Sequence, residues 1–119
     1  TEHIVLLHCI SAYPTDIKDA NLAVIYNLKR EFDCVIGQSD HTNDIKVPIF
    51  AAAMGAQILE KHYKIDDEMD CIDAPVSITE SKMKKLVKEL KFLEQIFGDN
   101  AISIRNAERE TAQYRRIVK

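Results

Sequence analysis

Short apolar runs alternate along this chain with longer segments of helical periodicity. The apolar runs are rich in Ile, Val and Leu and are typical of strands buried on both faces. The longer segments place apolar residues three and four positions apart, which is typical of helices with one buried face. Strands are predicted at residues 4–9, 34–37 and 56–62, and helices at residues 16–32, 45–54 and 79–97. The pattern therefore predicts three consecutive strand–helix units.

The last predicted helix has the strongest periodicity, and residue types mark its ends. Its apolar stripe is formed by Met83, Leu86, Val87, Leu90, Leu93 and Phe97. Ser77 and Glu80 have the spacing of a capping box, Thr79 is a rival N-cap, and Gly98 supplies the stop. Residues 101–119 are polar and weakly periodic, so we interpret them as a linker or docking tail.

Three such units predict an α/β fold with a parallel sheet, right-handed crossovers and covering helices. In this topology the loops at the carboxyl ends of the strands carry the chemistry. The polar residues at these ends are His8, Ser11, Tyr13, Ser39, Asp40, His41, Glu60 and His62. A sheet that served only as a core would not need so many, and we therefore expect a functional site at this edge.

His41 and His62 suggest what kind of site this is. Each follows a predicted strand, and neighbouring strands lie about 4.8 Å apart, so the two imidazoles could hold one metal ion. Two neutral imidazoles would leave coordination positions for water and substrate oxygens, as a catalytic metal site requires. The alternative is that each histidine simply forms a hydrogen bond at the end of its strand.

Composition excludes several classes of function. The 119 residues are 46% hydrophobic and 29% charged, which predicts one ordinary globular domain. A net charge of -3 offers no basic field, so no nucleic-acid partner is expected. The longest apolar stretch, residues 47–56, is too short to span a bilayer. The three cysteines form no Cys-x-x-Cys pair and no secretory leader is evident, so we expect a cytoplasmic protein.

The predicted sheet looks incomplete. Three strands alone would leave long hydrophobic edges, which native proteins normally cover. A complete (β/α)8 barrel needs about 250 residues. The sequence therefore looks like the last three-eighths of a larger structure.

Four linked motifs stand out in the sequence. They are Leu7-His8-Cys9-Ile10-Ser11-Ala12-Tyr13-Pro14-Thr15, Gly37-Gln38-Ser39-Asp40-His41-Thr42, Ala51-Ala52-Ala53-Met54-Gly55-Ala56 and Ile58-Leu59-Glu60-Lys61-His62-Tyr63. In this order and at these intervals they resemble the motifs of the sialic acid synthase family. This family comprises the N-acetylneuraminate, legionaminate and pseudaminate synthases and related spore-coat polysaccharide proteins. The resemblance implies that residues 1–98 are βα units 6–8 of a TIM barrel. Residues 99–119, with Glu108 and Tyr114-Arg115-Arg116, would lead toward an antifreeze-like domain.

The resemblance also implies an activity. Members of the family condense phosphoenolpyruvate with the open-chain form of an N-acetylated amino sugar, giving a nine-carbon 2-keto acid and phosphate. A divalent cation, Mn²⁺ or Mg²⁺, polarises the aldehyde oxygen. The full-length enzyme is expected to be a homodimer in which one subunit's antifreeze-like domain caps the other's barrel.

Site roles follow from the same resemblance. His41 and His62 would be the metal ligands and, with Glu60, the catalytic residues. Ser39 and Ser11 would bind phosphoenolpyruvate, although a loop serine is more often a turn former. Tyr13, Glu60 and Asp73 would contact the sugar; Tyr13 could instead be a rim aromatic, and Glu60 a partner of Lys61 or an arginine. Asp40 would accept a hydrogen bond from His41, and His8 would support the site.

Two features limit these expectations. Cys71 and Ala74 depart from the family pattern in the loop that reads the sugar, which leaves the amino sugar open. The resemblance implies that the lysines and the acidic residue that hold phosphoenolpyruvate and the sugar come from the first half of the barrel, outside these residues, so we expect the chain alone to be inactive or nearly so. One alternative is a non-catalytic or split-gene half-barrel that assembles with a partner. Another is a free-standing α/β binding module, although no Gly-rich phosphate loop follows the first strand.

Overall fold

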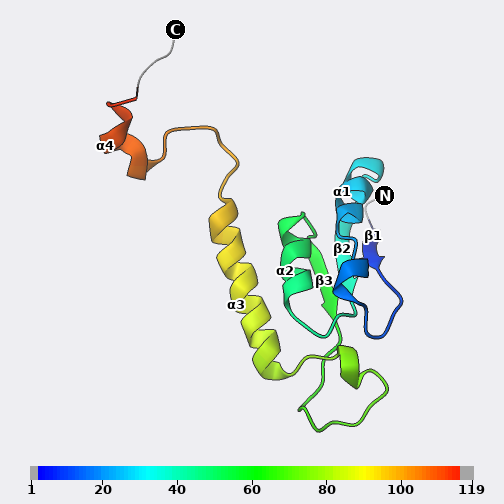
Figure 1. Cartoon of the computed structure of the whole chain (residues 1–119). Coiled ribbons are helices and arrows are strands. Elements are labelled where there is room, and N and C mark those ends of the chain that lie inside the picture. The colour runs from blue at the N-terminus through cyan, green and yellow to red at the C-terminus, as the bar shows by residue number, and fades with distance from the viewer. Residues whose placement is uncertain (1–2, 116–119) are drawn as a thin grey trace.

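A three-stranded parallel sheet lies toward one side of the molecule, and α3 and the segment after it extend away from that side (Figure 1). The computed structural model describes residues 3–115; residues 1–2 and 116–119, including Arg116 of the predicted linker, lie outside the described residues. The strands are β1 (Val5–Cys9), β2 (Val35–Asp40) and β3 (Ile58–Lys61), in the order β1-β2-β3. The predicted α/β architecture with parallel strands is confirmed.

A helix follows each strand. The helices are α1 (Ala23–Glu31), α2 (Lys46–Ala53), α3 (Glu80–Phe97) and the short α4 (Arg109–Ala112). Within residues 3–115 there are also single-turn 3-10 helices, η1 (Ile17–Asp19), η2 (Ala74–Val76) and η3 (Asn106–Glu108). The prediction of three strand–helix units is therefore confirmed, with changes at several boundaries.

The first helix begins later than predicted. Asp16 accepts a hydrogen bond from the Lys18 backbone amide at 3.2 Å, so it caps the 3-10 turn η1 rather than a long helix. Asn21 then has φ of 43°, a left-handed conformation that asparagine tolerates better than most residues. This residue separates η1 from α1, and the predicted helix from Asp16 was wrong over its first seven positions.

The second strand is longer than predicted. Backbone pairing continues past residue 37, because Ser39 pairs with Cys9 of β1 and Asp40 pairs with Lys61 of β3. The segment that joins the predicted strand at residues 34–37 to the predicted helix at residues 45–54 thus leaves the sheet only after Asp40. This extension matters because it fixes the directions of Ser39 and Asp40, which a loop would not do.

The start of the last helix distinguishes the two predicted caps. Thr79 occupies the N-cap position with extended backbone, whereas Ser77 donates a hydrogen bond to the Asp73 carbonyl at 2.7 Å. Gly98 follows the helix with φ of 62°, as a helix stop requires. Beyond it the chain extends away from the sheet, and its described part forms η3 and α4, so the region read as a linker contains short helices (Figure 1).

The two faces of the sheet have different surroundings. On one face, Ile36 of β2 packs with Ile25 of α1 and Ala51 of α2 to form the main core. On the opposite face, Val5, Val35 and Ile58 remain 44%, 36% and 42% exposed. We call these the covered face and the open face. Because side chains alternate along a strand, each strand contributes to both.

A second core cluster joins α2 to α3. Ile45 before α2 packs against Leu86 of α3 and Ile78. Two residues of the predicted apolar stripe, Val87 and Phe97, are exposed in the part of the chain that the structure describes. No helix in this part of the chain has the length and apolar character needed to cross a membrane.

Candidate functional site

Three aromatic rings meet beyond the carboxyl ends of the strands. The ring of Tyr13, from the loop after β1, stacks on His41 with centroids 4.1 Å apart. The ring of His62, directly after β3, lies 5.2 Å from that of His41 and 5.7 Å from that of Tyr13. The predicted convergence of the two histidines at one edge of the sheet is therefore confirmed.

His41 is held by the loop that follows β1. Its Nδ1 lies 2.8 Å from the carbonyl oxygen of Ile10, and its own carbonyl accepts a hydrogen bond from the Thr15 amide at 2.9 Å. Because a carbonyl can only accept, Nδ1 must carry the proton, which leaves Nε2 with a free lone pair. The Cys9 sulfur lies 3.9 Å from Nδ1 of His41.

His62 is held by the segment that returns from the acidic loop. The His62 carbonyl accepts a hydrogen bond from the Ile78 amide at 2.9 Å, and Ile78 pairs with Tyr63 in an isolated parallel bridge. This pairing closes the loop and places the Asp73 carboxylate 3.6 Å from Nδ1 of His62. An oxygen at this position favours a proton on Nδ1, so Nε2 is again the nitrogen left for a ligand.

Ser39 and Glu60 form a polar pair on the open face. They stand on neighbouring strands in register, and the Ser39 hydroxyl donates to the Glu60 carboxylate at 2.6 Å. Ser39 is buried and Glu60 is exposed. The predicted substrate residue and the predicted catalytic carboxylate therefore touch, and Glu60 is not the partner of Lys61.

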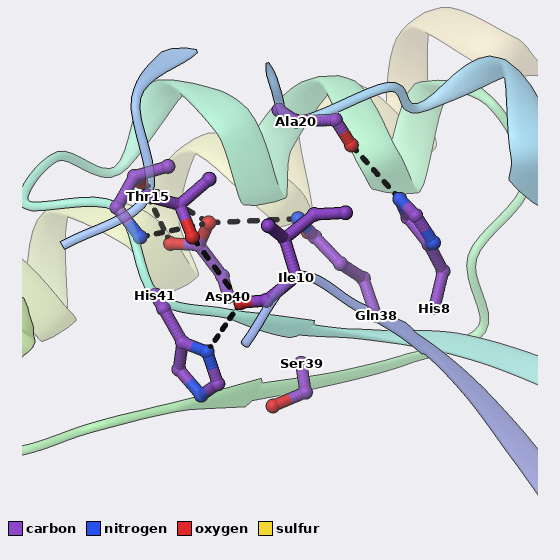
Figure 2. Close-up of a pocket in the computed structure, with 9 residues that line it drawn as sticks. His8, Ile10, Thr15, Ala20, Gln38, Ser39, Asp40 and His41 are labelled. Atoms are coloured by element: carbon purple, nitrogen blue, oxygen red, sulfur yellow. Dashed lines mark hydrogen bonds between the residues drawn. The ribbon is translucent and has the colours of Figure 1, made fainter. Parts of the chain in front are cut away.

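Two predicted site residues lie apart from this cluster. His8 points to the covered face, where its Nε2 lies 2.8 Å from the Ala20 carbonyl. Figure 2 shows His8 and His41 at opposite ends of one small pocket. Ser11 is exposed in the loop after β1, and within residues 3–115 it makes no hydrogen bond to another predicted site residue. His8 thus supports the β1 to α1 connection, not the ring cluster.

Asp40 also differs from its predicted role. Its carboxylate lies on the covered face, 2.8 Å from the Lys61 ammonium group and 2.9 Å from the Thr42 hydroxyl. The acceptor for His41 is instead the Ile10 carbonyl (Figure 2). The expectation that Asp40 receives a hydrogen bond from His41 was wrong because Asp40 is a strand residue whose side chain points away from the open face.

Lys61 is the residue that sequence reasoning missed. It alternates with Glu60 along β3, so it must lie on the covered face if Glu60 lies on the open one. A charged residue on a helix-covered face needs a partner of opposite charge. That signal could have marked Lys61 as a residue in need of a partner, whereas the identity of the partner, Asp40, depends on the strand register.

The donor chemistry fits a divalent cation in part. Both histidines present Nε2, and imidazole nitrogen is a ligand for Mn²⁺ as well as for softer metals. Within residues 3–115, however, no three His, Cys, Asp or Glu side chains converge as a complete ligand set. Water and substrate oxygens, or groups outside these residues, would have to supply the remaining ligands.

The fold and this cluster define a class before any relative is considered. They describe an α/β protein with parallel strands whose carboxyl ends carry histidines, an aromatic ring and a Ser–carboxylate pair, as in α/β enzymes that act on small molecules. The chain belongs to the NeuB family, which matches residues 1–101.

Individual relatives agree with this assignment. The chain is 37% identical to N,N'-diacetyllegionaminic acid synthase of Legionella pneumophila, over 98% of this chain and 35% of that protein. It is 36% identical to N-acetylneuraminate-9-phosphate synthase of Mus musculus, over 77% of this chain and 26% of that protein. The solved structure of N-acetylneuraminic acid synthetase from Leptospira borgpetersenii superposes with a TM-score of 0.88 and 39% identity, covering 92% of this chain and 39% of that one.

The chain is much shorter than these relatives. It spans 28% of the first curated relative that it matches and 35% of the Legionella enzyme. The Legionella and Mus musculus relatives are named as a synthase of N,N'-diacetyllegionaminic acid and a synthase of N-acetylneuraminate 9-phosphate.

Proposed function

We propose that this chain forms part of a synthase that condenses phosphoenolpyruvate with an N-acetylated amino sugar. The product would be a nine-carbon 2-keto sugar acid of the sialic acid type, with phosphate released. Membership of the NeuB family supports this proposal. The observation that carries it is the meeting of Tyr13, His41 and His62 beside the Ser39–Glu60 pair.

The histidines would hold the metal ion through their Nε2 atoms. When bound, Mn²⁺ or Mg²⁺ would supply Lewis acidity for an aldehyde oxygen. The contribution of this chain is to hold each neutral imidazole in the tautomer that leaves Nε2 as the ligand atom. The Ile10 carbonyl does this for His41 by holding the proton on Nδ1, and Asp73 stands in the corresponding place beside His62.

The remaining residues would bind and orient the substrates. The Ser39 hydroxyl now donates to Glu60, and a bound phosphate or carboxylate would accept the same hydrogen bond. Glu60 would then be free to accept from a sugar hydroxyl. Tyr13 and Asp73 flank the histidines from opposite loops and are partly exposed, which suits contact with a sugar at the rim. Ser11, exposed in the loop after β1, would offer a second hydroxyl to phosphoenolpyruvate.

The charge of this cluster explains why the chain alone should be inactive. The cluster contains imidazoles and carboxylates, whereas stabilising a phosphate requires cations. Lys61, the nearest lysine along β3, is buried against Asp40 on the covered face. Further strands that complete an eight-unit barrel would supply these charges and cover the apolar open face, and the complete enzyme would be a homodimer.

A test uses the full reading frame that contains this chain. Purified protein is given phosphoenolpyruvate, Mn²⁺ and a panel of N-acetylated hexosamines, and 2-keto acid and phosphate are measured. We expect His41→Ala and His62→Ala to lower the rate on the order of 100-fold or more, the effect typical of losing an electrostatic stabiliser. His3→Ala, an exposed histidine outside the cluster, is the matched control and should have no effect.

Two outcomes would contradict the proposal. Full activity in the His62→Ala protein would exclude the metal role. Absence of 2-keto acid with every sugar would favour the non-catalytic alternative, a partner-dependent half-barrel. Separately, measurable condensation by the purified 119-residue chain would contradict its expected inactivity.

A further inference from the structure

The covered face carries a buried ion pair directly behind the histidines. Lys61 Nζ lies 2.8 Å from Asp40 Oδ2, and the two side chains are 2% and 1% exposed. Burying both charges costs several kcal/mol per ion, and apolar residues of similar volume often give equal or greater stability. Stability alone is therefore a weak reason for this pair, and its position suggests another one.

Lys61 contacts the residues on both sides of His41 in the chain. Besides the Asp40 carboxylate, the Lys61 ammonium group donates to the backbone carbonyls of Asp40, at 3.5 Å, and of Thr42. These two residues flank His41 in the chain. Lys61 itself immediately precedes His62. One ammonium group thus joins the carbonyl groups of the residues before and after one histidine to the strand that directly precedes the other.

Further hydrogen bonds stiffen this connection. The Thr42 hydroxyl lies 2.9 Å from Asp40 Oδ2, and Gln38 Nε2 donates to Asp40 Oδ1 at 3.5 Å. Gln38 Oε1 is buried without a partner in the described residues. Gln38, Asp40 and Thr42 line a pocket of about 10 Å³ (Figure 2). A pocket of this volume has room for about one water molecule.

We propose that Lys61 is a positioning residue that, together with Asp40, sets the separation and orientation of His41 and His62. The inference rests on the proposed function, because the ligand that needs this separation is a divalent cation. Lys61 touches neither the cation nor a substrate. It acts through the backbone at Asp40 and Thr42, so its loss changes the geometry of a site that it does not line.

The test separates positioning from stability with three variants of the protein encoded by the full reading frame that contains this chain. Lys61→Met leaves Asp40 buried without a counter-charge. The double variant Asp40→Asn with Lys61→Met removes both charges but also removes the bonds to the two carbonyls. Lys29→Met is the matched control, because Lys29 also donates to a backbone carbonyl, that of Gly55 at 3.2 Å, at a distance from the histidines.

Two readouts are taken for each variant, beside the free energy of unfolding. The first is the nuclear Overhauser effect between the His41 and His62 ring protons in metal-free protein. The second is the Kd for Mn²⁺, from the electron paramagnetic resonance signal of free Mn²⁺. We expect Lys61→Met and the double variant to weaken the ring contact and to raise the Kd about tenfold or more, the effect typical of losing a group that orients a ligand.

The double variant decides between the two roles. Positioning predicts that its unfolding free energy recovers toward the wild type while the ring contact and the Kd stay changed. A double variant with wild-type ring contact and Kd would overturn the proposal, even if Lys61→Met fails to fold. Lys29→Met should leave both readouts unchanged, and a change there equal to that in the double variant would also overturn it.

The metal-free readout keeps this inference separate from the proposed function. If the wild-type full-length protein does not bind Mn²⁺, the metal role fails and the ring contact alone decides whether Lys61 positions the histidines. If Mn²⁺ binds but the ring contact does not depend on Lys61, the metal role stands and the positioning role is wrong.

Discussion

The covered and open faces of the sheet carry similar residue types with opposite surroundings. At the end of β2 and β3 the covered face has Asp40 and Lys61, which are almost fully buried and paired with each other. One position away on each strand, the open face has Ser39 and Glu60, of which Glu60 is exposed to solvent. The same stretch of two strands thus supplies both a closed polar network and an accessible one.

The difference teaches how to distinguish structural from functional polar residues. On the covered face each charge has a protein partner, because a buried charge without one is costly. On the open face the Ser39–Glu60 pair can exchange its single hydrogen bond for bonds to water or a ligand. A functional role therefore belongs to the face on which polar groups can change partners, and a positioning role to the face on which they cannot.

The largest expected effect is the loss of Asp40. Asp40→Asn leaves the Lys61 ammonium group buried without a counter-charge, and we expect the free energy of unfolding to fall by about 3–5 kcal/mol. Glu60→Gln, its counterpart on the open face, should lower it by less than about 1 kcal/mol. Urea unfolding at pH 7 measures both. Equal losses in the two variants would show that the two faces do not differ in this respect.

A smaller effect is expected where the open face is crowded. Gly37 has no side chain, and a Cβ there would meet the Ile58 backbone carbonyl and lie 2.6 Å from Leu7 Cδ2. Because backbone cannot yield as a flexible side chain does, Gly37→Ala should cost about 1–3 kcal/mol. Val35→Ile adds a methyl group on the same strand and face but at an exposed position, and should change stability by less than about 0.5 kcal/mol. Thermal unfolding distinguishes them, and a neutral Gly37→Ala would refute the crowding.

The smallest effect concerns an exposed ion pair, which contrasts with the buried one. Lys84 lies 2.6 Å from Glu80 in the first turn of α3, and its hydrogen bond and charge lower the pKa of Glu80 from the ordinary 4.5. The pair therefore adds a small amount to the free energy of unfolding above pH 4.5. This contribution is lost as the pH falls through the lowered pKa of Glu80. Glu80→Gln should be slightly less stable than wild type at pH 7 and equal to it near pH 2. A difference that persists in acid would contradict this linkage.

Hydrophobic pattern was sufficient to predict the order and type of the main elements. The runs ending at Cys9 and His62 and the stripe through Leu86 are local signals, and each became the expected strand or helix. Boundaries were less predictable. Asn21 breaks the first helix by its own conformation, and β2 continues to Asp40 because strands on both sides pair with it.

The candidate site was predicted as a set of residues more successfully than as a set of contacts. The approach of His41 to His62 follows from parallel topology, which brings strand ends together. The partners of Asp40 and His8 do not follow from it, because they depend on which face a side chain enters. The stripe of α3 was predicted as buried, yet Val87 and Phe97 are exposed, since burial depends on what packs against the helix.

By itself, the sequence determined the strand–helix repeat, the family, and the placement of Tyr13, His41, Glu60 and His62 at one edge of the sheet. These features rest on hydrophobic periodicity and local motifs, which can be recognised in the amino-acid sequence without knowledge of the tertiary structure. Only the tertiary structure decided that Lys61 lies behind the histidines, that the Ile10 carbonyl orients His41, and that Ser39 meets Glu60. Those contacts depend on strand register, and a shift of one residue would exchange the two faces.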